Sequence, residues 1–243
     1  MKTKAIPLLL AFVLTAPMAL IAHADAPASP DAPQLDQTTA SRLVYGLLSD
    51  SRYAYRPRAL DQTAADQVFD KYLETLDGGK QFFVQADIDG FAPMRAEVGN
   101  AIRAGRMDMA YAIFDTYKQR AADRVAHARE LLKSEPDFSV AERYDYDRKD
   151  AAWAADSAEL DEIWRKSIKN DWLRLKLAGK PAADIRSTLD KRYATLLKSI
   201  GELKGDDVFA FFLNAYTASI DPHTDYLTPR SAENFNQAMS LSL

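Results

Sequence analysis

The segment DMAYAIFDTYKQRAADRVAHARELLK, residues 108–133, sets the fold class of this chain. Its apolar side chains recur at intervals of three or four residues along the whole segment, at Tyr111, Phe114, Tyr117, Ala121, Val125, Ala128 and Leu132. Residues at this spacing share one face of an α-helix. The pattern predicts one long helix buried along one side, which Pro136 terminates.

Three shorter helices are predicted on the N-terminal side of this segment. The first has an apolar stripe that we expect to face the core, made of Leu43, Val44, Tyr45, Leu47 and Leu48, and it ends at Pro57. The second begins at Asp61, whose side chain can cap it, and stops at the glycine pair 78–79. The third begins at Asp87 or Asp89 and ends near Gly105.

The helical spacing returns after a weak region at 139–155, which is rich in Tyr, Asp and Arg and has no clear period. Trp164, Ile168 and Trp172 lie on one predicted face, which favours core packing over a sugar-binding surface. A turn at 179–181 and a helix start at Gly205 divide the rest into two more helices. We find no alternating runs bounded by hairpin turns. The sequence therefore predicts an all-α domain over residues 37–220, with about seven helices and no substantial sheet.

The first 36 residues are predicted to lie outside this domain. Lys2 and Lys4 precede an apolar run that is too short to span a bilayer, and Ala22-His23-Ala24 fits a signal-peptidase site. We expect residues 1–24 to be a signal peptide that is cleaved before Asp25, which places the mature protein in the periplasm. Residues 25–36, rich in Pro and Ala, are predicted to be a linker.

The composition excludes several classes of protein. Loss of Lys2 and Lys4 with the signal takes the 31 basic residues to 29 against 35 acidic residues, a net charge of −6 that argues against nucleic-acid binding. The absence of Cys removes disulfides, thiol nucleophiles and thiolate metal ligands. We see no second stretch of transmembrane length, so we expect no membrane span after cleavage.

Short motifs that could bind ligands have simpler structural interpretations. Residues 77–80, DGGK, lack the upstream glycine and the following Ser or Thr of a phosphate loop, so we interpret them as a helix end. Asp87 and Asp89 lack the remaining ligands of a calcium loop and are expected to cap a helix. His127 is expected on a solvated helix face, and His223 in a turn, although flanking carboxylates leave a metal site open as an alternative.

A search for catalytic motifs is equally negative. The chain has no Gly-x-Ser-x-Gly and no Ser-x-x-Lys, so we assign no catalytic, cofactor-binding or metal-binding residue and expect no cofactor. A Ser/Lys dyad between distant residues stays open, as does a helical glycan-cleaving enzyme with a Glu in a deep cleft.

The end of the chain, DPHTDYLTPRSAENFNQAMSLSL at 221–243, differs from the rest. A proline-broken turn leads into a short polar helix-like piece and then an apolar Ser/Leu tail. This segment resembles the one that leads into the PDZ domain in tail-specific (carboxy-terminal processing) proteases. The residues that carry the resemblance are Asp221, Pro222, His223, Thr224, Tyr226, Leu227, Pro229, Arg230, Phe235, Asn236 and Met239. Residues 69–77, together with 82–83 and 87–91, resemble the helical N-terminal domain of the same family.

The resemblance implies a function for the chain. In this family a PDZ module that recognises apolar C-termini and a Ser/Lys-dyad protease core follow the N-terminal helices. No residue here matches the nucleophile, the base or the oxyanion hole. We therefore expect a non-catalytic domain that scaffolds PDZ and protease domains missing from this chain, with 221–243 as the connector. The resemblance implies protein substrates as further partners, and an adaptor protein as another candidate partner.

A stand-alone exported helical binding or adaptor protein is the alternative. Such a protein should tolerate deletion of residues 235–243, whereas a domain separated from its protease should expose an apolar tail. The sequence does not distinguish a natural stop after Leu243 from a frameshift or a fragment boundary.

Overall fold

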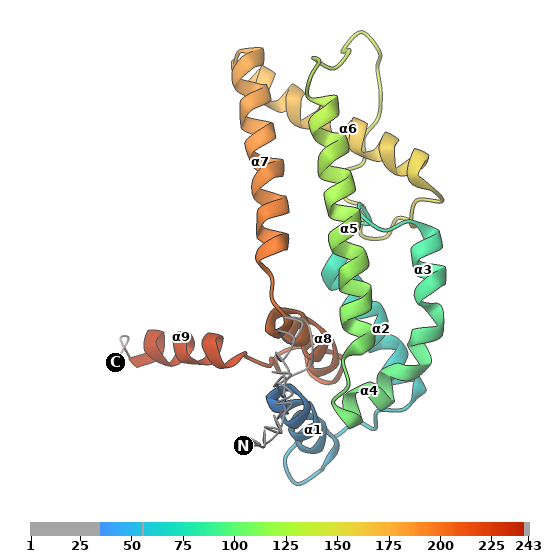
Figure 1. Ribbon diagram of the computed structural model, residues 1–243, viewed down its shortest axis with the longest axis vertical. Coiled ribbons are helices and arrows are strands. Elements are labelled where there is room, and N and C mark those ends of the chain that lie inside the picture. The colour runs from blue at the N-terminus through green and yellow to red at the C-terminus, as the bar shows by residue number, and fades with distance from the viewer. Residues whose placement is uncertain (1–34, 55, 241–243) are drawn as a thin grey trace, which may run out of the picture.

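The computed structural model describes residues 35–54 and 56–240, and this part of the chain is built from helices (Figure 1). Over the described residues there are nine α-helices, one 3₁₀-helix and no strand, which confirms the predicted all-α class with more helices than the expected seven or so. One isolated parallel β-bridge joins Val84 to Ala154. The described part of the chain has no helix that is long and apolar enough to cross a membrane.

The elements follow one another in the order α1 Leu35–Ser49, α2 Gln62–Asp77, α3 Gln85–Phe91, η1 Ala92–Glu97, α4 Val98–Ala104, α5 Asp108–Leu131, α6 Ser157–Leu177, α7 Ala182–Glu202, α8 Gly205–Ile220 and α9 Pro229–Ser240. The prediction of a single helix between Asp87 and Gly105 is wrong, because this segment is divided into α3, η1 and α4. Pro93 lies at the start of η1, and a proline lacks the N–H that a continuous helix needs there. The helix expected to reach Pro57 ends at Ser49.

Helix α5 has 24 residues and contributes to both hydrophobic cores of the described chain. Its sequence predicts one long helix that is buried along one side. Its first half contributes Tyr111, Phe114 and Tyr117 to a core shared with α2 and α8. Its second half contributes Val125 and Ala128 to a separate core shared with α6 and α7. Figure 1 shows α5 running through both halves of the body. One continuous apolar face thus serves two hydrophobic cores placed end to end.

The first core is closed mainly by α2 and α8. Tyr72 of α2 packs edge-to-face on Phe212 of α8, with ring centroids 5.2 Å apart. The hydroxyl of Tyr72 also donates a hydrogen bond to the carbonyl oxygen of Ala110 in α5, at 2.8 Å. A buried phenol needs such an acceptor, because an unpaired buried hydroxyl destabilises the fold. The three helices are therefore joined by packing and by a specific polar contact.

The predicted apolar stripe of α1 faces the body only in part: Val44, Tyr45 and Leu48 pack against the first core. Leu43 and Leu47 are 60% and 41% exposed, whereas Ser41 is fully buried. The Ser41 hydroxyl donates to the carbonyl oxygen of Ile102 at 2.8 Å. The Gln37 amide donates to Asp206 at 2.6 Å. The orientation of α1 is thus set by buried polar contacts together with part of its apolar stripe, and Leu43 and Leu47 point outward.

The close approach of α1 to the end of α4 requires a glycine. Gly105 ends α4 in the left-handed region, with φ of 70°. A Cβ at this position would lie 2.6 Å from the carbonyl oxygen of Thr38. Any larger residue would therefore combine backbone strain with a clash against the α1 backbone.

The second core confirms the tryptophan prediction. Trp164, Ile168 and Trp172 are all buried between α5, α6 and α7.

The expectation of a solvated face at His127 is only partly met. Arg124 is bonded to Asp161 of α6, and the His127 Nε2 lies 3.8 Å from the same carboxylate, so this face of α5 is turned towards a neighbouring helix.

Candidate functional site

The connector begins with a tight turn directly after α8. The Asp221 carboxylate accepts a hydrogen bond from the backbone N–H of His223 at 2.9 Å, and the N–H of Thr224 donates to the Asp221 carbonyl oxygen at 3.0 Å. This is the turn geometry expected of an Asp-Pro sequence. His223 is exposed. Within the described residues no group of three or more acidic or His side chains could hold a metal ion.

An amide clamp then fastens the connector to the body. The Asn214 side chain on α8 donates to the carbonyl oxygen of Tyr226 at 3.0 Å and accepts from the N–H of Tyr226 at 2.6 Å. The Tyr226 ring packs edge-to-face on Phe209, with centroids 5.2 Å apart. Sequence reasoning missed Asn214, although a lone amide in the apolar run of α8 was a usable signal. The clamp fixes the direction in which the chain leaves the body.

Helix α9 follows the clamp and extends away from the body (Figure 1). Its start is capped by Thr228, whose hydroxyl accepts from the N–H of Ser231 at 3.2 Å. None of its residues is buried, and Phe235 and Met239 are 55% and 51% exposed. Five more residues predicted for the connector are exposed, some before α9 and some within it: Pro222, Leu227, Pro229, Arg230 and Asn236. The rest of the Ser/Leu tail, 241–243, lies outside the described residues.

Of the residues predicted for the connector, the structure therefore brings only the first few onto the body. The N–H of Asp221 donates to the Thr217 carbonyl oxygen in α8 at 3.0 Å, Tyr226 is bonded to Asn214, and Thr224 is half-buried. The residues after Tyr226 do not form a common site with them. This division separates an anchored part of the connector from a projecting part.

The turn after α2 explains the motif at 69–83 in structural terms. Asp77 is 3% exposed, and its carboxylate accepts from three backbone N–H groups, those of Gln81, Phe82 and Phe83, at 2.7, 2.8 and 2.9 Å. Burial raises the pKa of Asp77 above its usual value, against the opposing effect of these three donors. Residues 77–80 thus form a helix end, as predicted, and the carboxylate organises the chain that follows it.

Asp87 has the capping role predicted for it. Its carboxylate accepts from the N–H of Val84 at 3.1 Å, at the start of α3. The guanidinium of Arg120 on α5 donates to both of its oxygens, at 2.9 and 2.7 Å. These contacts attach α3 to α5.

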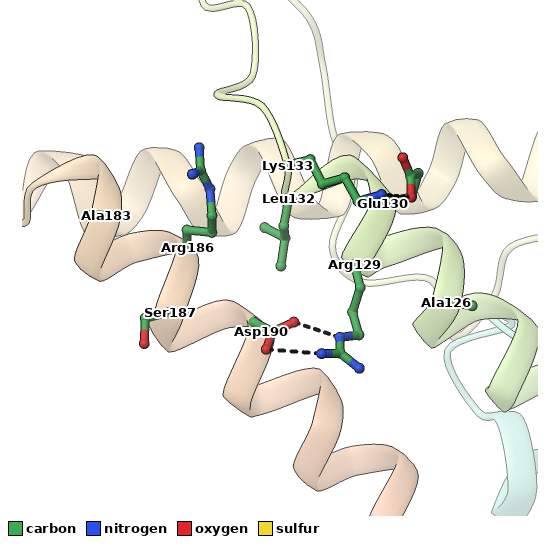
Figure 2. A pocket seen from close by; sticks show the side chains of 9 residues that line it. All are labelled: Ala126, Arg129, Glu130, Leu132, Lys133, Ala183, Arg186, Ser187 and Asp190. Carbon is green, nitrogen blue, oxygen red and sulfur yellow. Dashed lines mark hydrogen bonds and ion pairs between the residues drawn. The ribbon is translucent and has the colours of Figure 1, made fainter.

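A cavity of about 640 Å³ lies between α5 and α7, and four of its five charged residues form two ion pairs (Figure 2). Arg129 donates to both oxygens of Asp190, at 2.6 and 3.3 Å, across the gap between the two helices. On the α5 side, Lys133 pairs with Glu130 at 2.6 Å. Arg186 of α7 is the remaining charged residue of the lining. We interpret this cavity as a bridged helix interface, because the Arg129–Asp190 pair spans it.

The comparisons with known proteins identify the family of this chain. Residues 47–230 match the family model described as "Tail specific protease N-terminal domain". The chain is also 35% identical, over 193 residues, to the tail-specific protease of Haemophilus influenzae. This alignment covers 78% of the chain and 27% of that protease, so the chain spans much less than the length of the relative. The chain belongs to the tail-specific protease N-terminal domain family.

Proposed function

We propose that this chain is the non-catalytic N-terminal domain of a periplasmic tail-specific serine protease, and that it scaffolds the PDZ and protease domains of that enzyme. The substrates of the enzyme would be proteins with apolar C-termini. The projecting helix α9, which buries none of its residues in the body, is the observation that carries this proposal.

Two features of the chain support a scaffolding role. The body has two cores joined by α5, so it offers a rigid support along its length. The Asn214–Tyr226 clamp holds the point at which the connector leaves that support. Modules attached beyond α9 would therefore be held in a restricted direction relative to the body.

The export part of the proposal rests on residues 1–24, which lie outside the described residues. The positive start, the apolar run and the Ala22-His23-Ala24 site support cleavage before Asp25 and a periplasmic location. Edman or mass-spectrometric determination of the mature N-terminus tests it directly. An intact N-terminus on the exported protein would contradict it.

A chimera tests the scaffolding role. In the Haemophilus influenzae protease, the matching segment is replaced by residues 47–243 of this chain, and cleavage of an unfolded reporter with an apolar C-terminus is measured. We expect the chimera to cleave the reporter and residues 25–243 alone to be inert. Circular dichroism and gel filtration show whether each protein is folded.

Two outcomes would contradict the proposal. Cleavage by residues 25–243 alone that is lost when one Ser is changed to Ala would make this chain an enzyme. A folded chimera that does not cleave the reporter would show that this domain does not support the protease modules, and would favour the stand-alone adaptor.

A further inference from the structure

A groove along α6 carries the strongest unassigned ligand-binding features of the described chain. Its first wall is the loop 139–153, which is fixed to α6 through Glu142. The Glu142 carboxylate accepts from Lys169 at 2.5 Å and from Arg165 at 3.2 Å. Lys169 also donates to the carbonyl oxygen of Val140 at 3.0 Å. The loop is therefore held in place by ionic contacts, and the space beside it is preformed.

Two adjoining cavities make up this space, which we call the α6 groove. One has a volume of about 410 Å³ and the other about 520 Å³, and Tyr144 and Asn170 line both. The two cavities adjoin at these residues and together follow α6 from Lys166 to Arg174. Two adjoining cavities in a row suit an extended chain better than a compact small molecule.

The unneutralised charge of the α6 groove is positive. Its two acidic residues are engaged: Glu142 pairs with Arg165 and Lys169, and Asp171 with Arg192 at 2.7 Å. Three further cations line the groove, and none of them has an ion-pair partner among the described residues: Arg143, Lys166 and Arg174. The chain as a whole has a net charge of −4. A local excess of cations on an acidic protein selects for an anionic partner.

The cations are too far apart along α6 to converge on one small anion. Lys166 and Arg174 are eight positions apart on the helix, a rise of ~12 Å at 1.5 Å per residue. An extended peptide covers the same length with three or four residues. Apolar contact is available between them, because Tyr146 and Leu173 are 82% and 38% exposed. The Asn170 amide can pair with a peptide backbone.

We propose that the α6 groove binds an extended acidic peptide segment of a partner or substrate protein, with at least one apolar side chain between its carboxylates. The carboxylates would contact Lys166 and Arg174, and the apolar side chain would pack on Tyr146 and Leu173. This inference does not depend on the proposed function, because it concerns a surface remote from the connector in sequence and carried by different elements.

Fluorescence anisotropy with residues 25–243 tests the proposal. The probe is a fluorescein-labelled peptide of Glu residues interrupted by Leu and Phe, and the comparison peptide has Gln at every Glu. We expect the Glu peptide to bind, with an affinity that falls as salt is added. The Lys166→Glu/Arg174→Glu variant should bind roughly tenfold more weakly, since two attractive contacts become repulsive.

Matched variants distinguish specific binding in the α6 groove from a general effect of the protein's net charge on peptide binding. Lys191→Glu/Lys198→Glu makes the same change in net charge on exposed positions of α7 that line neither cavity, and it should leave binding within about twofold. Tyr146→Ala removes an exposed side chain that cannot be needed for folding, and should weaken binding about threefold.

Each opposite result overturns the proposal. These results are equal binding of the Gln peptide, absence of binding, an equal loss in the α7 variant, or no effect of Tyr146→Ala. Tighter binding of a sulfated heparin oligosaccharide than of the Glu peptide, with the same dependence on Lys166 and Arg174, would assign the groove to glycans instead of peptides.

Discussion

Helices α8 and α9 are consecutive in the chain and differ completely in their surroundings. Helix α8 places nine of its 16 residues in the interior, whereas none of the 12 residues of α9 is buried. Between them the chain is held to the body as far as Tyr226 and then leaves it. The comparison teaches that the connector has two parts. One is bonded to the helical body, and the other buries none of its helical residues there.

The largest contrast is expected between matched phenylalanines on these two helices. Phe212 of α8 is fully buried, and Phe235 of α9 is 55% exposed. Phe212→Ala should lower the free energy of unfolding by about 3–5 kcal/mol through lost burial and a cavity. Phe235→Ala should change it by less than about 0.5 kcal/mol. Urea unfolding followed by circular dichroism measures both, and similar losses would refute the division.

The two aspartate turns give the next largest contrast. Asp77→Asn keeps one acceptor oxygen but replaces the other by an amide donor that faces at least one of the three N–H groups, which should cost about 2–3 kcal/mol. Asp221→Asn affects one N–H contact in an exposed turn and should cost less than about 1 kcal/mol. Thermal unfolding of the two variants compares them. Equal destabilisation would mean that the connector turn is as important to the body as the α2 turn.

The clamp should have a smaller and more local effect. Asn214→Ala removes both hydrogen bonds to Tyr226, and we expect a loss of about 1 kcal/mol. Amide hydrogen exchange of residues 221–228 should accelerate, while that of α2 and α5 stays unchanged. Gln119, on the exposed side of α5, offers the control substitution Gln119→Ala. Unchanged exchange at 221–228 would show that the clamp does not hold the connector.

The smallest effect should come from the loop 139–153, which ion pairs hold to α6. The side chains of Arg165 and Lys169 lower the pKa of Glu142 to about 2. A carboxylate with a lowered pKa in the folded state stabilises it at pH above its ordinary value, and this contribution is lost as the pH falls towards about 2. Glu142→Gln should therefore lower the Tm slightly at pH 7, and the difference from the wild type should vanish near pH 2. A difference that grows in acid would contradict the ion-pair account.

The sequence predicted the helices whose apolar spacing is regular and whose partners are also apolar. The periodicity of α5 and the tryptophans of α6 predicted side chains that line the two cores, although the division into two cores was not predicted. The prediction for α1 was right only in part. Val44, Tyr45 and Leu48 pack on the core, but Gln37 and Ser41 also face inward to meet polar partners from distant segments, Asp206 and the Ile102 carbonyl. Contacts between residues so far apart in the chain cannot be read from local spacing.

The candidate site was predictable only in part for the same reason. Asp221 forms the turn that its neighbouring proline indicates. Asn214 was missed because its role depends on where residue 226 returns to α8. The α6 groove was missed because the region 139–155 has no periodicity, and its walls become defined only when Glu142 meets α6.

Hydrogen exchange of α9 tests the central claim most directly. It is measured in residues 25–243 alone and in the chimera with the rest of the Haemophilus influenzae protease. We predict fast exchange throughout α9 beside a protected α8 in the isolated chain, and protection of α9 in the chimera. Protection of α9 equal to that of α8 in the isolated chain, or fast exchange of α9 in both proteins, would contradict the account.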